Sequence, residues 1–312
     1  MSVIALTGAT GFVGRSLVGQ LKRTFPDATL RVLVRDAADR TLPVALETGC
    51  QIINGGLESA DALERLVCGS DAVIHAAAAI AGNHAESFDR INIVGTRCLL
   101  DSIDRQAPNC HLVQISSLAA GKPALSWYAA SKRAAEELVS ARARRYSIVR
   151  PPAVYGPEDP ALADFWRWLA RGWLIRLGPV NARFSLLHVD DLAGAVAELV
   201  AKGPIRRNIT LAGDQPPGGW SWEAVGAVAA RVRGGKVRIA ALPRIALKSV
   251  AGLNLLRART LSRPAILTPG KARELLYPDW VCDNQAAGQM IDWQPTTSLE
   301  QALDTLPGWR RQ

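Results

Sequence analysis

The sequence predicts an α/β fold, in which a doubly wound parallel sheet is joined by a smaller C-terminal domain. A short apolar run at residues 3–7, rich in β-branched residues, leads directly into a glycine-rich turn and a helix. Further apolar runs at 29–34, 51–54, 71–79 and 111–115 alternate with stretches of helical periodicity. Strands that alternate with helices in this way form a parallel sheet with helices on both faces.

The glycine-rich turn predicts a dinucleotide site of the Rossmann type. Gly8, Gly11 and Gly14 stand between the first strand and the first helix. One glycine permits a tight turn, one lets backbone N–H groups approach a pyrophosphate, and one lets helix and strand pack closely. The pyrophosphate is expected at the helix N-terminus, which favours an anion. The predicted contacts in this turn are Gly8, Thr10, Gly11, Phe12, Val13 and Gly14.

The second strand, at 29–34, carries the prediction of cofactor type. It ends at Arg35, at the position where NAD-binding units place an Asp or Glu on the ribose. An arginine there pairs instead with a 2′-phosphate, so we expect NADP, with Arg40 as a second cation. Asp36 follows directly and could serve as the acid, which keeps NAD as the alternative.

The fourth and fifth strands lead into the remaining predicted cofactor and catalytic residues. Small residues after the fourth strand, Ala76 to Ala78, would let the cofactor come close to the backbone, whereas His75 is expected to be a core histidine without a metal. The fifth strand ends in Ser117, and Tyr128 and Lys132 share one face of the following helix. An ammonium group beside a phenol lowers the phenol pKa, which suits proton transfer to or from a carbonyl oxygen.

With these motifs in order, the chain resembles the extended branch of the short-chain dehydrogenase/reductase superfamily. Six motifs over the first two-thirds of the chain carry the resemblance: Gly8-x-x-Gly11-x-x-Gly14, Asn92-x-x-Gly95-Thr96, Ser117, Tyr128-x-x-x-Lys132, Arg150-Pro151-x-x-Val154-Tyr155-Gly156-Pro157 and His188-Val189-Asp190-Asp191-Leu192-Ala193. The resemblance implies Ser117, Tyr128 and Lys132 as the catalytic triad. It also implies that Asn92 supports the proton relay or the helix that holds the relay. The cofactor contacts expected with it are Leu57, Ala76, Ala77, Ala78, Tyr128, Lys132, Pro151 and Val154.

The resemblance also implies a reaction and a substrate class. Leu118 and Ala119 follow Ser117 where dehydratases of this branch carry Asp and Glu, which argues against dehydration. Arg35 matches the arginine of NADP-using carbonyl reductases of the dihydroflavonol type. We therefore expect an NADP-dependent oxidoreductase that interconverts a secondary alcohol and a ketone, with the ketone steroid-like, flavonoid-like, sugar or lipid. The alternatives are a nucleotide-sugar epimerase with tightly bound NAD and a non-catalytic NADPH-binding module.

Composition limits the compartment and the partners. The 312 residues contain no apolar run of the roughly 20 residues that a membrane helix needs, and the first strand begins without a signal peptide. Five scattered cysteines predict reduced thiols and a cytoplasmic location. The expected partner is a small-molecule substrate. A homodimer is possible, and the sequence does not decide the oligomeric state.

The net charge of +9 exceeds what a phosphate-rich cofactor and substrate would explain. The arginines are spread out without a stacked-aromatic motif, so nucleic acid is not expected. Residues 243–263 mix Leu, Ile and Val with five cations. They are either a basic surface for a membrane or partner, or a helix whose cations face water. We favour the second interpretation.

Two domains are expected to interleave along the chain. The dinucleotide-binding domain would comprise residues 1–165 with 184–213, and the substrate domain residues 166–183 with 214–312. The ligand crevice is expected at the carboxyl ends of the strands, where open α/β sheets bind ligands.

Overall fold

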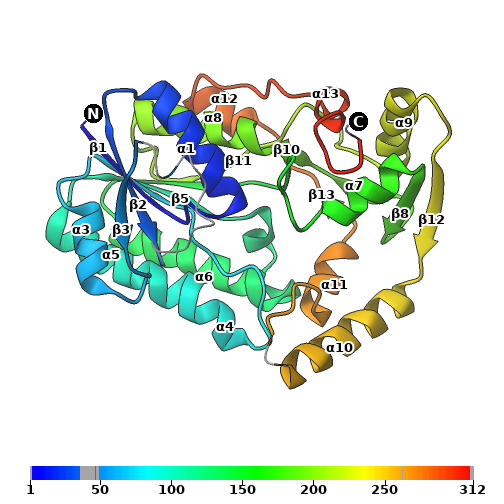
Figure 1. Cartoon of the computed structure of the whole chain (residues 1–312), viewed down its shortest axis with the longest axis horizontal. Coiled ribbons are helices and arrows are strands. Elements are labelled where there is room, and N and C mark those ends of the chain that lie inside the picture. The colour runs from blue at the N-terminus through cyan, green and yellow to red at the C-terminus, as the bar shows by residue number, and fades with distance from the viewer. Residues whose placement is uncertain (1, 36–45, 47–48, 262, 310–312) are drawn as a thin grey trace.

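The computed structural model describes residues 2–35, 46, 49–261 and 263–309. Its centre is a parallel sheet with the strand order β11-β6-β5-β4-β1-β2-β3 (Figure 1). The strands are β1 (Val3–Thr7), β2 (Thr29–Val34), β3 (Gln51–Asn54), β4 (Ala72–His75), β5 (His111–Ile115), β6 (Tyr146–Arg150) and β11 (Asn208–Thr210). Every neighbouring pair in this sheet is parallel. The predicted Rossmann-type α/β fold is confirmed.

Helices cover both faces of the sheet because successive strand residues point to opposite sides. Ile4 and Leu6 of β1 belong to one buried apolar cluster, and Ala5 between them belongs to another. The first cluster includes residues of α1 (Phe12–Thr24) and α8 (Val189–Lys202). The second includes residues of α3 (Ala60–Val67), α5 (Gly95–Gln106) and α6 (Trp127–Arg142). Figure 1 shows these two groups of helices above and below the sheet.

The order of the strands fixes where a ligand crevice opens. β1 pairs with β2 on one side and with β4 on the other, so the strand order reverses between β1 and β4. The connections that leave β1 and β4 therefore run to opposite faces, and open α/β sheets bind ligands at the carboxyl edge beside such a reversal. The turn at Gly8 and the small residues after His75 stand at this edge, as the sequence predicts.

The rest of the chain forms short helices and three small parallel pairs of strands. β8 (Trp173–Leu177) pairs with β12 (Arg238–Leu242), β7 (Ala153–Tyr155) with β10 (Leu186–His188), and β9 (Arg183–Phe184) with β13 (Asp279–Trp280). A third apolar cluster joins α7 (Ala163–Ala170), β8, α9 (Trp222–Arg233) and α13 (Leu299–Leu303). Further α-helices in the described part of the chain are α4 (Ala85–Asp89), α10 (Arg244–Thr260), α11 (Pro269–Leu275) and α12 (Gln285–Met290). The boundaries of the two predicted domains stay a prediction.

Three local features depend on the tertiary structure. Residues 173–177 form β8, which is held by the distant strand β12. Residues 183–188 contain two short strands, β9 and β10, and the helix that carries Tyr128 ends at Arg142. Within the described ranges, no helix combines the length and the apolar character needed to cross a membrane.

Candidate active site

The glycine turn is shaped for close approach at two of its three glycines. Gly8 has a φ of +78°, and a Cβ atom there would lie 2.6 Å from the backbone nitrogen of Ala77. A Cβ on Gly14 would lie 2.0 Å from the carbonyl oxygen of Gly8. Gly11 begins α1 without a side-chain cap, and the first turn of that helix has no acidic residue. The N–H groups at this helix start fit a phosphate group.

Other predicted cofactor residues line the same edge of the sheet. Arg35 is exposed directly after β2, whereas Asp36 and Arg40 lie outside the described residues. Leu57 is buried after β3, and a Cβ on Gly95 would lie 2.6 Å from its Cδ1 atom. Ala76, Ala77 and Ala78 are half-buried after β4, as is Val154 in β7. The residues present therefore fit a pyridine dinucleotide across the carboxyl ends of β1 to β4.

Ser117 and Tyr128 meet at the carboxyl end of β5. Ser117 follows the strand in an extended conformation, and its hydroxyl accepts a hydrogen bond from the Ala119 N–H at 3.2 Å. Tyr128 lies in the first turn of α6, which is capped by Ser126. The Ser117 and Tyr128 side chains are hydrogen-bonded to each other. Two hydroxyl groups are thus held together, as a site that binds one substrate oxygen requires.

Lys132 reaches the same strand end from the next turn of α6. Its Nζ atom is buried and donates a hydrogen bond to the carbonyl oxygen of Ile115 at 2.7 Å. Burial lowers the pKa of Lys132 to about 8, against the opposing effect of Glu136. Burial raises the pKa of Tyr128 to about 12, and its hydrogen bond with Ser117 offsets only part of that shift. The expected lowering of the Tyr128 pKa by Lys132 is therefore wrong for this arrangement.

A buried ion pair supports the strand ends behind these residues. Arg150 donates two hydrogen bonds to Glu136, at 2.8 Å and 2.5 Å. The same carboxylate accepts a hydrogen bond from the Ser116 hydroxyl at 2.5 Å. The Leu118 N–H donates to the carbonyl oxygen of Pro151 at 2.8 Å. β5, β6 and α6 are thus fixed relative to one another beside the candidate triad.

The Asn92 side chain joins α6 to the chain that follows β4. It is buried in a π-helical segment (Arg90–Val94), a helix type that is frequent at functional sites. Its amide accepts from the Ala79 N–H at 2.8 Å and donates to the Ala79 carbonyl at 3.1 Å. It also donates to the Ser131 hydroxyl at 2.9 Å. These hydrogen bonds tie α6 to the chain that follows β4, and a role of Asn92 in the site stays a prediction.

Residues of α11 complete the surroundings of Tyr128 and were missed by the sequence analysis. Lys271 Nζ lies 5.9 Å from the centroid of the Tyr128 ring and forms an ion pair with Glu274 at 2.7 Å. Glu274 also accepts a hydrogen bond from Ser126, the cap of α6. Phe88 contacts the Tyr128 ring edge-on, with the centroids 6.4 Å apart. No local motif marks these residues, because only the tertiary fold brings α11 to α6.

His75 is a core histidine, as predicted, with both ring nitrogens hydrogen-bonded. Thr96 donates its proton to the Asn92 carbonyl at 2.7 Å, so it accepts from the His75 Nε2–H at 2.9 Å. Nδ1 then accepts from the Thr7 hydroxyl at 2.7 Å. Burial lowers the pKa of His75 to about 3, so the ring is neutral. Among the described residues, no cluster of His, Cys, Asp and Glu could hold a metal ion.

Neutral His75 predicts a loss of stability in acid. Its pKa is about 3 in the folded protein and near 6.5 when unfolded, so the unfolded chain binds the proton first as pH falls. Between pH 7 and pH 5, this group should lower the free energy of unfolding by about 2 kcal/mol. Urea unfolding at both pH values should show this loss. Buried His111 and His188 add to it because their pKa values are lowered too.

The His75→Gln variant should lose about 2 kcal/mol of the difference in unfolding free energy between pH 7 and pH 5. An unchanged pH dependence would contradict the assignment, with the exposed His84→Gln variant as control.

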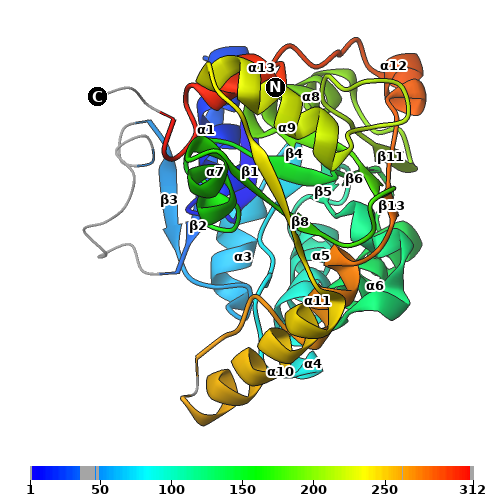
Figure 2. The same cartoon turned by 90° about the vertical axis from the view of Figure 1, so that its right-hand side faces the viewer.

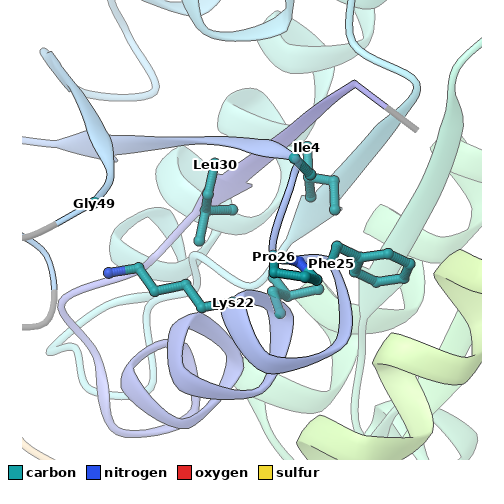
Figure 3. A pocket seen from close by; sticks show the side chains of 8 residues that line it. Ile4, Lys22, Phe25, Pro26, Leu30 and Gly49 are labelled. Atoms are coloured by element: carbon teal, nitrogen blue, oxygen red, sulfur yellow. The ribbon is translucent and has the colours of Figure 1, made fainter.

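One pocket lies at the opposite edge of the sheet and is separate from the candidate site (Figure 3). It is bordered by Ile4 at the start of β1, Leu30 at the start of β2, and Lys22 and Phe25 at the end of α1. These are the amino ends of the strands, whereas Ser117 and the glycine turn stand at the carboxyl ends. The pocket shares no residue with the candidate site.

The sequence is similar to a family of known enzymes and to individual members with assigned names. Residues 4–212 match the model of the NAD dependent epimerase/dehydratase family. The chain is 36% identical over 280 residues to a protein of Caulobacter vibrioides named ceramide reductase, which covers 89% of this chain and 85% of that one. It is 26% identical over 242 residues to dTDP-glucose 4,6-dehydratase of Mycobacterium tuberculosis, with coverages of 68% and 72%.

Solved structures share the fold over nearly the whole chain. UDP-glucose 4-epimerase of Thermotoga maritima superposes with a TM-score of 0.73 at 18% identity, covering 99% of this chain and 98% of that one. dTDP-glucose 4,6-dehydratase of Bacillus anthracis, solved in complex with NAD, gives a TM-score of 0.72 at 15% identity, with coverages of 99% and 96%. At these identities the superpositions establish the fold alone.

Proposed function

Because the chain belongs to the NAD dependent epimerase/dehydratase family, we propose that it is an NADP(H)-dependent oxidoreductase that interconverts a secondary alcohol and a ketone. It is an enzyme of the extended short-chain dehydrogenase/reductase type. The observation that carries the proposal is the hydrogen-bonded pair of Ser117 and Tyr128, with the Lys132 amine at the adjoining strand end.

Each member of the proposed triad has a separate task. Ser117 binds the substrate oxygen, and Tyr128 exchanges a proton with it. Lys132, held at the Ile115 carbonyl, presents its remaining N–H donors to the ribose of the cofactor. The nicotinamide supplies or takes up the hydride when bound. At neutral pH the Tyr128 phenol is protonated, because burial raises its pKa to about 12. In ketone reduction the phenol gives this proton to the substrate oxygen, and in alcohol oxidation it takes a proton back.

The substrate we propose is a lipid ketone. The 36% identity to a protein named ceramide reductase, over 89% of this chain, supports a lipid over a sugar, a steroid or a flavonoid. Leu118 and Ala119 after Ser117 argue against dehydration, since they leave no acid–base pair to expel water. The proposed cofactor is NADP, because exposed Arg35 at the end of β2 suits a 2′-phosphate.

The proposed compartment is the cytoplasm, where thiols stay reduced. No disulfide joins the five cysteines within the described part of the chain.

A turnover assay separates the proposed reaction from its alternatives. Purified protein is given NADPH or NADH together with a long-chain ketone, a steroid ketone, a flavonoid ketone or a UDP-sugar. We expect NADPH to be consumed with the long-chain ketone. Conversion of the UDP-sugar by protein purified with bound NAD, without consumption of added NADPH, would replace the proposal by the epimerase alternative. NADPH binding without turnover of any compound would favour the non-catalytic alternative.

A further inference from the structure

Helix α10 exposes two kinds of side chain that rarely share a water-facing surface. Its buried stripe consists of Leu247, Ala251, Leu255 and Ala258, and the first two of these pack against Ala272 and Leu276 at α11. The opposite face, at the same helical spacing, carries Ile245, Leu253 and Leu256, whose relative exposures are 80%, 68% and 61%. Leu261 and Ile266, which follow the helix in sequence, are also exposed. We call these five exposed residues the α10 face.

Cations border the α10 face, and acidic residues are absent from its part of the chain. Lys248 and Arg259 lie on one flank of the helix and Arg257 lies on the other, all exposed, with Arg244 and Arg263 near its ends. From Glu223 to Glu274 the sequence contains no Asp or Glu between those two residues. The interpretation favoured from the sequence, a helix whose cations face water, therefore explains only part of this surface. Large apolar side chains face outward among the cations.

The geometry points to one occupant, and we propose that the α10 face docks the protein on an anionic lipid surface. A helix that lies in a membrane interface buries an apolar face in the headgroup region and keeps cations at its flanks. Each Lys or Arg near an anionic leaflet adds attraction, and long side chains place their charges among the phosphates. α10 lies along the rim of the molecule in both Figure 1 and Figure 2, free of other elements on its outer side.

A second copy of this chain fits the α10 face less well. A twofold dimer places the same surface patch of both subunits in contact. The flanking cations of α10 would then approach their own counterparts, and no acidic residue of this stretch could compensate them. Phosphate headgroups supply the missing negative charge.

Docking through α10 would also bring the candidate site to the lipid. Asn254 donates a hydrogen bond to the Leu267 carbonyl at 2.9 Å, which ties α10 to the segment that enters α11. Asn83, in the chain that follows β4, donates to the Arg263 carbonyl at 2.8 Å. α11 in turn carries Lys271 beside Tyr128. Delivery of a lipid substrate along this route rests on the proposed function, whereas docking itself does not.

Sedimentation with vesicles tests the docking without substrate or cofactor. The full chain is mixed with vesicles of phosphatidylcholine alone, or with about one third phosphatidylglycerol, at low and high salt. We expect binding to the anionic vesicles that weakens in high salt. Leu253→Asn/Leu256→Asn and Lys248→Gln/Arg257→Gln should each lower the partition coefficient by about tenfold or more.

Matched controls separate the α10 face from general stickiness and charge. Arg23→Gln/Arg65→Gln removes two exposed cations from α1 and α3, and Trp168→Gln removes an exposed apolar side chain from α7. Both should bind vesicles like the wild type, and circular dichroism should show all variants folded. No binding to anionic vesicles, equal binding to neutral ones, or equal loss in the controls would overturn the proposal. A wild-type dimer that the leucine variant converts to a monomer, without vesicle binding, would assign the face to a second copy.

Discussion

Tyr128→Phe is expected to lower kcat by about 10²–10⁴-fold, the usual contribution of general acid–base catalysis. The phenylalanine ring keeps the contact with Phe88, and only the hydroxyl that pairs with Ser117 is lost. Lys132 still donates to the Ile115 carbonyl, so the affinity for NADP(H) should barely change. Steady-state rates with the long-chain ketone and cofactor titration by fluorescence measure the two effects separately.

Tyr146→Phe provides the matched control for this prediction. Tyr146 is the first residue of β6 and stands at the amino edge of the sheet, away from Ser117. Loss of its hydroxyl should leave kcat unchanged. A Tyr128→Phe enzyme with the wild-type kcat would exclude Tyr128 as the group that transfers the proton.

Arg35→Ala is expected to weaken NADP(H) binding by roughly ten- to a hundredfold, because a charge-assisted contact to phosphate contributes about 1.5–3 kcal/mol. NAD(H) lacks the 2′-phosphate, so its affinity should stay nearly the same. Arg35→Asp should go further, since it repels the phosphate and offers acceptors to the ribose hydroxyls. Fluorescence titration of both cofactors against the wild type and both variants gives the ratios.

The exposed Arg23 of α1 supplies the control for general loss of positive charge, and Arg23→Ala should leave both affinities unchanged. Asp36 follows Arg35 directly and could contact the ribose itself. A wild type that binds NAD(H) more tightly than NADP(H) would make the NADP assignment wrong and would favour the epimerase alternative.

Features set by residues close in sequence could be predicted, and they include the order of the main elements. Gly8 and Gly14 mark the dinucleotide turn because the backbone there leaves no room for a Cβ atom. The spacing of Tyr128 and Lys132 places both on the side of α6 that meets β5. His75 was expected to be a core residue, and its two threonine partners account for that outcome.

Features that depend on contacts between distant segments could not be predicted from the sequence. β8 exists because β12 pairs with it, and Lys271 reaches Tyr128 only after α11 packs on α6. The spacing of Tyr128 and Lys132 predicts a lowered Tyr128 pKa, but it does not reveal the burial of the phenol, which raises that pKa. The outward apolar side of α10 was also hidden, because periodicity does not tell which of two apolar stripes is buried.

Transfer of deuterium from NADPH to the product tests the central assignment most directly. NADPH labelled at the transferred position on C4 is incubated with the protein and a long-chain ketone, and the alcohol is analysed by mass spectrometry. The proposed reaction predicts one deuterium on the carbinol carbon and an equal amount of NADP⁺. Conversion of substrate without label in the product and without formation of NADP⁺ would contradict it.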